Sequence, residues 1–498
     1  MENQSVICRS AMRLFQAETT AEQDFIVPDI KPDIKKVLKL TATPILHQSD
    51  YGQGRLTLSG DLMVYLCYLP EDGLTARGME LRLPFSDVLE TGGDGCVPEV
   101  QVRRLTCNLI NGRKISLRAQ LSVNCFCSQT EEVTLLCPDE DDDLRVLKKP
   151  FSYCKTVVTE PRTVEFSERL ELPSQSAPVR ELLSVEPTVL IQEYQALTDR
   201  IALSGVVRVE TLYLPDTDPC HIARMEHELP FTEIIRADGL NEDAYCQIAV
   251  LPCRFEVGLC EDSDGDARMV SLRYGFRLVA DACNNETCDA VTDAFGISRP
   301  VTLKNASLKA VCNCQRRTLT HNIREVLPIE SVLEVCSLTA VARVVSTAKE
   351  ESVLTLNGEL TVNALVLCEP DGLPEAVTAT LPFTAVDDGG CHCDEVCATA
   401  VCEHAGYTLR ADGGVELRAT VKLTVTGAAS ETVAVVTQLT PCEAAQEKPC
   451  RMVVYFPQEK DCLWDVAKRY GCCPKKIATV NGLEETCESL PHQPILIP

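Results

Sequence analysis

The sequence has little tryptophan and histidine, and it lacks the short motifs that mark common catalytic sites. Its 498 residues include one tryptophan and seven histidines, which leaves few general bases. It contains no Gly-x-x-x-x-Gly-Lys-Ser/Thr loop, no Gly-x-Ser-x-Gly elbow and no His-Glu-x-x-His motif. Nucleotide hydrolysis, serine-hydrolase chemistry and zinc-protease chemistry therefore have no recognisable site. We expect a protein that is not an enzyme and that uses no cofactor.

Long apolar runs and an excess of positive charge are also missing. The longest apolar runs, such as residues 62–69, fall short of the ~18 residues that cross a bilayer, so no transmembrane segment is expected. The N-terminal residues lack the apolar core of a secretory signal, and we expect a cytoplasmic protein. With 47 basic and 73 acidic residues, the formal net charge is -26. This charge disfavours nucleic acid and anionic lipid as partners.

Cysteine is frequent, and its interpretation depends on the compartment. The chain has 28 cysteines, whereas its 45% of hydrophobic and 24% of charged residues are ordinary for a globular protein. A disulfide framework is typical of short secreted proteins, but this chain is long and shows no export signal. We interpret the thiols as reduced, small buried hydrophobic residues. Late oxidation or cross-linking within an assembly stays open as the alternative.

Three segments of the chain resemble one another in sequence and spacing. Each contains an alternating run with a central glycine: RLTLSGDLMVYLCYLPEDG (55–73), RIALSGVVRVETLYLPDTD (200–218) and SVLTLNGELTVNALVLCEPDG (352–372). A Leu-Pro-Phe follows each run, and its proline lies 24, 25 and 24 residues after the central glycine. Three matches at this spacing indicate an internal repeat.

The pattern within each unit predicts strands and one short helical element. Alternation at period two is typical of a half-buried antiparallel strand, and the central glycine suggests a bulge or a close backbone approach. Apolar residues behind a proline, at 32–38, 178–183 and 328–333, predict a single helical turn at the start of each unit. Hairpin turns are predicted later in the units, at Asn111-Gly112, Asp264-Gly265 and Asp412-Gly413.

These features predict a mainly β protein with three repeated antiparallel β-rich modules and a small βααβ domain. The modules are placed at residues 1–145, 146–298 and 299–442, and the small domain at 450–498. Acidic residues at 139–143 form one boundary. They lack the spaced ligands of a calcium loop, so we interpret them as a solvated linker.

A group of cysteine and histidine residues in the third unit is a weak metal candidate. Thiolates and imidazoles this close in sequence could hold zinc, but the chain contains no Cys-x-x-Cys, and we expect no metal site. The pairs Cys283/Cys288 and Cys312/Cys314 are weaker candidates still. The residues of the first group are Cys391, Cys393, Cys397, Cys402 and His404.

The last fifty residues are predicted to fold as strand, helix, helix and strand. Asp461 is expected to cap the first helix, Gly471 to end it and Pro474 to start the second. The segment resembles the LysM domain. The matching residues are Asp461, Leu463, Trp464, Val466, Ala467, Tyr470, Gly471, Ile477, Asn481, Gly482, Leu483, Leu496, Ile497 and Pro498.

The LysM resemblance implies a groove between two loops, which in that family commonly binds N-acetylglucosamine polymers. The loops usually read Pro-Gly-Asp-Thr and Pro-Gly-Gln, whereas here they read Glu459-Lys460-Asp461-Cys462 and Pro491-His492-Gln493. Side chains thus occupy places where a sugar would approach the backbone, which favours a protein partner. Trp464 is either a packing residue or a partly exposed anchor for that partner.

Three such β units followed by one LysM domain resemble the SipL-like family of spore-coat morphogenesis proteins. Their repeat is the SPOCS domain, and residues 27–38, which read VPDIKPDIKKVL, carry the resemblance together with Leu-Pro-Phe. The resemblance implies a non-enzymatic scaffold in the mother cell, at the outer forespore surface, that helps the spore coat encase the forespore.

The same resemblance implies the partners of the scaffold. They are a coat-basement ATPase of the SpoIVA type, bound through the LysM domain, and other coat proteins. An anchor protein that binds peptidoglycan or N-acetylglucosamine polymers is the alternative. The groove residues expected to contact the partner are Lys460, Asp461, Cys462, Leu463, Trp464, Asn481, Gly482, Leu483, Pro491 and His492.

Overall fold

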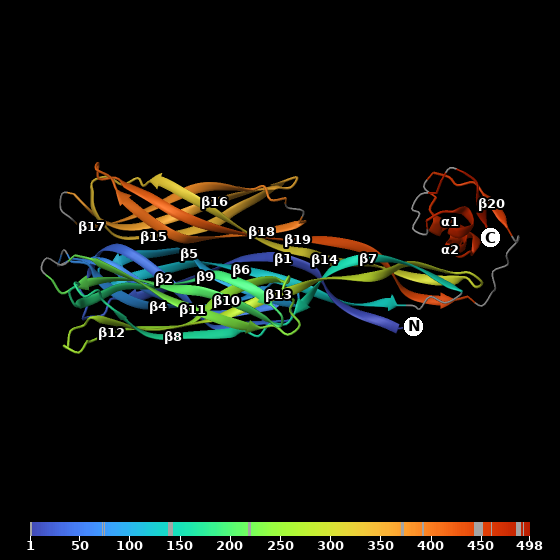
Figure 1. Ribbon diagram of the computed structural model, residues 1–498. Coiled ribbons are helices and arrows are strands. Elements are labelled where there is room, and N and C mark those ends of the chain that lie inside the picture. Colours follow the sequence, from blue (N-terminus) through green and yellow to red (C-terminus); the bar gives the residue numbers. More distant parts are fainter. Residues whose placement is uncertain are drawn as a thin grey trace.

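The chain is almost entirely β-strand, as a computed structural model shows. The structure describes residues 2–137, 143–217, 221–369, 373–390, 393–442, 452–484 and 490–498, without residues 72, 74, 460 and 492. The prediction of a mainly β protein is confirmed. Figure 1 shows a broad body, a narrower stalk made by the ends of long strands, and a small helical part beside the end of the stalk. Neither helix in the described part of the chain has the length and apolar character that a membrane crossing requires.

Residues 2–137, here called the first stretch, form two three-stranded antiparallel sheets. One sheet contains, in order, β2 (Ile34–Gly52), β3 (Arg55–Pro70) and β4 (Arg77–Glu90). The other contains, in order, β1 (Glu2–Ile26), β6 (Lys114–Cys137) and β5 (Gly95–Asn111). Apolar side chains of the central strands β3 and β6 pack together in one core. The Asn-Gly hairpin turn predicted between residues 111 and 112 joins β5 to β6, as expected.

The second stretch, residues 144–296, has the same arrangement, except that two strands, β7 and β8, take the place that the single strand β1 has in the first stretch. Its first sheet contains β9 (Val179–Leu197), β10 (Arg200–Pro215) and β11 (Ala223–Arg236). Its second sheet contains, in order, β12 (Tyr245–Cys260), β13 (Met269–Gly296) and β7 (Leu144–Val157), and β8 (Arg162–Glu171) also pairs with β13.

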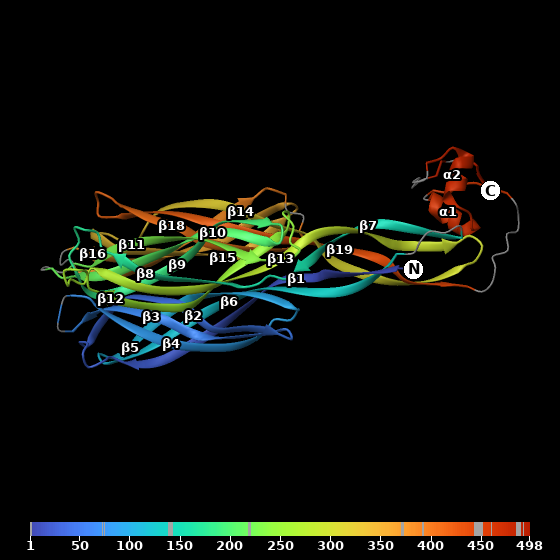
Figure 2. The same cartoon turned by 60° about the horizontal axis from the view of Figure 1, so that its bottom comes forward.

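The third stretch, residues 301–441, again forms two three-stranded sheets. The first contains β15 (Val332–Glu350), β16 (Val353–Cys368) and β17 (Leu373–Asp387). The second contains, in order, β14 (Val301–Val326), β19 (Val415–Pro441) and β18 (Glu395–Leu409). The long strands β1, β6, β7, β13, β14 and β19 extend beyond the body and form the stalk (Figure 2).

The central glycine of each alternating run lies opposite the phenylalanine of Leu-Pro-Phe. The paired residues are Gly60 and Phe85, Gly205 and Phe231, and Gly358 and Phe383. The strand on the other side of each glycine has a bulge at that point. A Cβ added at Gly60 would lie 2.1 Å from the carbonyl oxygen of Ile45, so the expected close backbone approach is confirmed. The matched spacing in the sequence is therefore the register of two paired strands.

The expected helical turn at the start of each unit is wrong. The motifs at residues 32–38, 178–183 and 328–333 lead into β2, β9 and β15, which begin at residues 34, 179 and 332. Near its start, each of these strands has two β-bulges, and at each bulge one of its residues has no partner on the neighbouring strand. A bulge changes which face the following side chains occupy, so the apolar spacing imitates that of a helix. The residues at the second shift are Leu38, Leu183 and Cys336.

These bulged residues meet in one apolar cluster, which joins the three stretches. The cluster also contains residues seven and nine positions after each central glycine, namely Cys67, Leu69, Leu212, Leu214, Leu365 and Leu367. Corresponding positions of the three stretches thus surround a common axis. The stalk has a similar cluster, in which Leu135, Ala290 and Val435 lie twenty residues after Ile115, Val270 and Val415. Both ends of the molecule therefore have the same approximate threefold packing.

A buried polar group lies beside the axis in the body. The Lys39 ammonium lies 2.7 Å from Glu186 and 3.6 Å from Glu210, and it donates a hydrogen bond of 2.9 Å to the Ser337 hydroxyl. Ser337 in turn donates to Glu210. Desolvation lowers the pKa of Lys39, but the two carboxylates outweigh it and raise the pKa above its usual value. One side chain therefore connects all three stretches.

Replacing Gly60 by alanine should destabilise the protein, because the new Cβ would collide with backbone. We expect a loss on the order of 1–3 kcal/mol in the free energy of unfolding, measured by chemical denaturation. Gly52→Ala is the matched control, because nothing lies within 4 Å of its added Cβ. Equal stability of the two variants would contradict the register described above.

Lys39→Met should destabilise the protein more, because it leaves the Glu186 carboxylate without its cation, although Glu210 keeps its ion pair with Arg224. A loss on the order of 3 kcal/mol is expected at neutral pH. The raised pKa of Lys39 means that its stabilisation is complete below the unfolded pKa and is lost as pH rises through the folded pKa. The difference from the wild type should therefore shrink at strongly alkaline pH. Lys36→Met, at a side chain 52% exposed, is the control and should be nearly neutral.

Candidate functional site

The C-terminal residues 452–498 are here called the C-terminal module, and their described part contains two short strands and two short helices. They are β20 (Val453–Tyr455), α1 (Leu463–Tyr470), α2 (Pro474–Asn481) and β21 (Ile495–Ile497). β20 and β21 pair in antiparallel fashion, with Val454 opposite Leu496. A small core forms between the helices and the strands, and it includes Leu463, Val466, Ala467, Ile477 and Ile495.

The helix ends of this module follow its sequence, with one exception. Gly471 and Gly482 adopt the left-handed conformation, with φ of 55° and 64°, and end α1 and α2. Pro474 is the first residue of α2, as predicted. The prediction that Asp461 caps α1 is wrong, because the N-cap is Cys462.

Asp461 instead orders the loop before α1. Its carboxylate accepts hydrogen bonds from the Tyr455 hydroxyl and from the Gln458 backbone N–H. These hydrogen bonds lower the pKa of Asp461. The cap itself comes from the Cys462 sulfur, which accepts a hydrogen bond of 3.4 Å from the Asp465 N–H. Although aspartate is a common N-cap residue, Asp461 orders the loop one position before the cap.

The two loops expected to line a groove lie side by side. The Leu490 N–H donates to the Asp461 carbonyl at 3.1 Å, which joins the loop before α1 to the loop before β21. Cys462 and Pro491 are partly exposed in these loops. Lys460 and His492, also expected to contact a partner, lie outside the described residues.

Several expected contact residues hold the module together. Leu463 is only 2% exposed and belongs to the core, and Leu483 packs against that core. The Asn481 amide donates to the carbonyls of Ile477 and Leu496, and its oxygen accepts from the Leu496 N–H. Asn481 thus fastens α2 to β21. These side chains have structural roles, so their substitution would not test binding alone.

Trp464 contacts the end of β13 in the stalk. Its indole N–H donates to Asp293 at 2.8 Å, and its ring meets the Phe295 ring edge-on with centroids 5.0 Å apart. Lys468 lies 2.6 Å and 2.7 Å from the two carboxylate oxygens of Asp293. Phe295 belongs to the same apolar cluster as the core of the C-terminal module. Trp464 therefore attaches the C-terminal module to the stalk of the same chain.

A thiol contributes a further contact with the stalk. The Arg145 guanidinium, in β7, donates a hydrogen bond of 3.4 Å to the Cys473 sulfur. Burial opposes ionisation of this thiol, but the hydrogen bond from Arg145 and those from backbone N–H groups lower its pKa below the usual value. Sequence reasoning did not identify Arg145, Asp293 or Phe295. Each is an ordinary strand residue, and Asp293 is 171 positions from Trp464, so no local signal could reveal these contacts.

An exposed apolar strip covers one face of the two-stranded sheet. This outer strip consists of Met452, Val454, Phe456 and Leu496, which are 60%, 56%, 69% and 37% exposed. The first three alternate along β20 and its ends, and Leu496 is the residue paired with Val454. Contiguous exposed apolar side chains are typical of an interaction surface.

The cysteine and histidine residues of the weak metal candidate in the third stretch do not form a cluster in the described part of the chain. Cys391 lies outside the described residues. Cys393, Cys397, Cys402 and His404 are described, and they do not gather into a group of three or more ligands. The group that does form unites Cys154, Cys283 and Cys314, from three different strands. No disulfide joins two of the 24 cysteines in the described residues, and thirteen of these cysteines are buried.

Asp293→Asn should loosen the contact between the C-terminal module and the stalk. The variant removes the charge that attracts Lys468 and weakens the hydrogen bond to Trp464. Because Trp464 is the one tryptophan of the chain, its fluorescence reports this contact directly. We expect emission at longer wavelength and stronger quenching by acrylamide. The cost in unfolding free energy should be below about 1 kcal/mol, since the ion pair is partly solvated. Asp289→Asn, at an exposed position of the same strand, should leave the emission unchanged.

Comparison with known proteins gives one match, within the second stretch. Residues 178–256 match the family model described as SipL, SPOCS domain. This segment covers β9, β10, β11 and most of β12, and so includes the central glycine and Leu-Pro-Phe. Comparisons with curated proteins and with solved structures give no match. Over residues 178–256 the chain is similar to the SPOCS domain of SipL.

Proposed function

We propose that the protein is a non-enzymatic scaffold of spore-coat assembly. In this proposal three copies of a SPOCS-type module carry a LysM-type module that binds the coat-basement ATPase of the SpoIVA type. The match at residues 178–256 is the observation that carries the proposal. The first and third stretches support it, because they repeat the strand order, bulges and glycine–phenylalanine register of the matched stretch.

A scaffold must hold its contact surfaces at fixed positions, and the packing of this chain suits that task. The shared apolar cluster and the buried Lys39 fix the three stretches to one another. Asp293 and Phe295 in turn hold the C-terminal module at the end of the stalk. We place the protein in the mother-cell cytosol at the outer forespore surface, where other coat proteins could bind the body.

The C-terminal module is proposed to bind protein through its outer strip and the adjoining loops. The order of its elements and the contact between its two loops support a LysM-type module. Lys460 and His492 stand where the sugar-binding loops have glycine, which disfavours sugar. The outer strip offers apolar area that a protein partner would cover. A peptidoglycan- or N-acetylglucosamine-binding anchor is the alternative, because the two loops do lie side by side.

The test is capture by the full chain of two candidate partners in parallel. One is the coat-basement ATPase from the same organism, and the other is insoluble peptidoglycan. We expect capture of the ATPase and a loss of about tenfold or more in affinity with Phe456→Glu, because the charge would be buried at the contact. Ile26→Glu, on a residue 75% exposed at the end of β1, is the control and should bind normally.

Two results would contradict this proposal. Capture by peptidoglycan alone would establish the anchor instead of the scaffold. Equal ATPase affinity of Phe456→Glu and Ile26→Glu would show that the outer strip is not the contact surface.

A further inference from the structure

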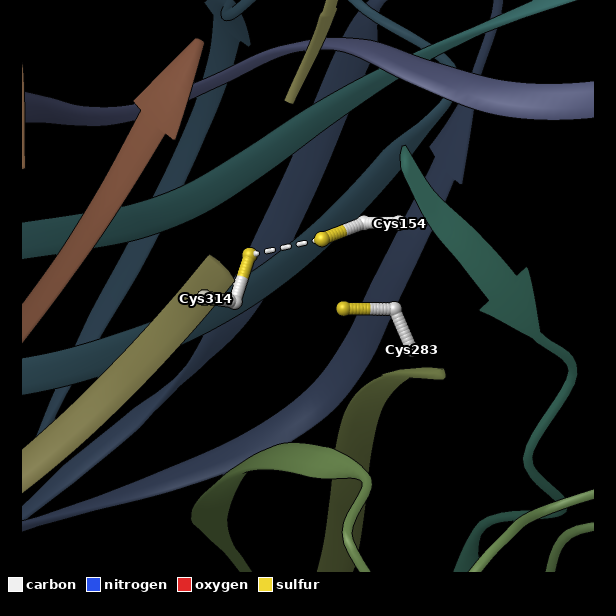
Figure 3. A group of neighbouring side chains, drawn as sticks. All are labelled: Cys154, Cys283 and Cys314. Atoms are coloured by element: carbon white, nitrogen blue, oxygen red, sulfur yellow. Dashed lines mark hydrogen bonds between the residues drawn. The ribbon is translucent and has the colours of Figure 1, made fainter. Parts of the chain in front are cut away.

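Three cysteine sulfurs converge where the second and third stretches meet. Cys154 in β7, Cys283 in β13 and Cys314 in β14 place their Sγ atoms within 4.8 Å of one another. The Sγ atoms of Cys154 and Cys314 are 3.4 Å apart. Figure 3 shows the three side chains directed into one space from different strands. Their sequence positions gave no indication of this, because the strand register and the contact between stretches bring them together.

The thiol group is buried, and apolar side chains pack against part of it. Cys154 and Cys283 are fully buried and Cys314 is 6% exposed. The side chains packed around them are those of Met12, Tyr245, Val311 and Ala428. Among the described residues, no histidine or carboxylate belongs to the group. Asn285 contributes one oxygen beside it, 3.2 Å from the Cys154 sulfur.

The charge of this region is nearly balanced. Arg9 is fully buried and holds Asp281 through two hydrogen bonds, of 2.7 Å and 2.8 Å. It also donates to the Ala282 carbonyl, next to Cys283. Because Asp281 pairs with Arg9, this carboxylate is not available to a cation. An added cation here would be held by sulfur.

The three thiols differ in the direction in which their pKa is shifted. Hydrogen bonds from Cys283 and Cys314 lower the pKa of Cys154. The hydrogen bonds with Cys154 raise the pKa of Cys283 and of Cys314. Metal ions displace the protons of thiols when they bind.

We propose that Cys154, Cys283 and Cys314 form a binding site for a soft d¹⁰ metal ion, Zn²⁺ or Cu⁺. Metal–sulfur bonds of ~2.3 Å place sulfurs around one ion roughly 3.8 Å apart. The observed separations, from 3.4 Å to below 4.8 Å, bracket this value. Thiolates select soft ions, and a site with so little oxygen disfavours Mg²⁺ and Ca²⁺.

The ion would join two stretches through a few short bonds. Cys154 and Cys283 belong to the second stretch and Cys314 to the third, so the bound ion would fix β14 to the sheet formed by β7 and β13. Binding would release the remaining thiol protons to solvent. This inference does not depend on the proposed function, because it concerns the joining of the stretches and not their partner.

The test is metal titration of the full chain, reduced and freed of metal under anaerobic conditions. Zn²⁺ and Cu⁺ are added separately in competition with a chromophoric chelator. We expect one tight equivalent per chain with at least one of the two ions. X-ray absorption of that complex should show a sulfur shell at ~2.3 Å.

Variants distinguish this site from the many other thiols. Cys314→Ala and Cys154→Ala should each weaken the tight equivalent by about a hundredfold, because each removes a direct ligand. Cys127→Ala is the matched control, since Cys127 is buried and its sulfur lies 3.9 Å from that of the partly buried Cys96, outside the group. It should retain the tight equivalent. Melting curves without metal establish that each variant is folded.

The proposal fails if the wild type has no tight equivalent for either ion. It also fails if Cys127→Ala loses as much affinity as Cys314→Ala. Absorption data that show an oxygen or nitrogen shell in place of sulfur would overturn it without any variant. A disulfide between Cys154 and Cys314 in protein isolated without oxidant would show that the thiols serve redox chemistry instead.

Discussion

The packing of the three stretches depends on a β-bulge that recurs near the start of β2, β9 and β15. It directs Leu38, Leu183 and Cys336 toward one common axis. A regular strand would direct alternate residues to opposite faces, and these residues could not all meet. The bulge also determines the position of the following residue in each strand. At that position the first stretch has Lys39 and the other two have Ser184 and Ser337. A single lysine there is neutralised by Glu186 and Glu210, whereas three lysines around one axis would repel one another.

The sequence predicts those parts of the fold that depend on neighbouring residues. Alternation locates β3, β10 and β16, and the Asn-Gly and Asp-Gly pairs locate hairpins, because both signals are local. The paired glycine and phenylalanine are visible as a spacing, although only the register explains it. The helical turn was wrong because a bulge disturbs alternation, and a disturbed strand has nearly the apolar spacing of a helix. The cap at Asp461 was wrong because its neighbour Cys462 serves as N-cap while the Tyr455 hydroxyl occupies the carboxylate.

The contacts between the C-terminal module and the stalk could not be predicted from the sequence, for a different reason. Asp293 and Phe295 differ in no local way from other strand residues, and they matter because the stalk ends beside the C-terminal module. The three converging cysteines likewise belong to separate strands of two stretches. With Trp464 packed on the stalk, the exposed large apolar side chains in the described part of the module are those of the outer strip and Val480. The partner surface is therefore expected on the sheet and its adjoining loops, with the Trp464 face already occupied by the chain itself.

Hydrogen exchange of the full chain, with and without the coat-basement ATPase, tests the central claim most directly. The claim is that a rigid three-stretch body presents the C-terminal module to a protein partner. The account predicts added protection of backbone amides at residues 452–459 and 490–497, with the three stretches unchanged. Protection confined to the body, or no protection in the presence of saturating ATPase, would contradict it.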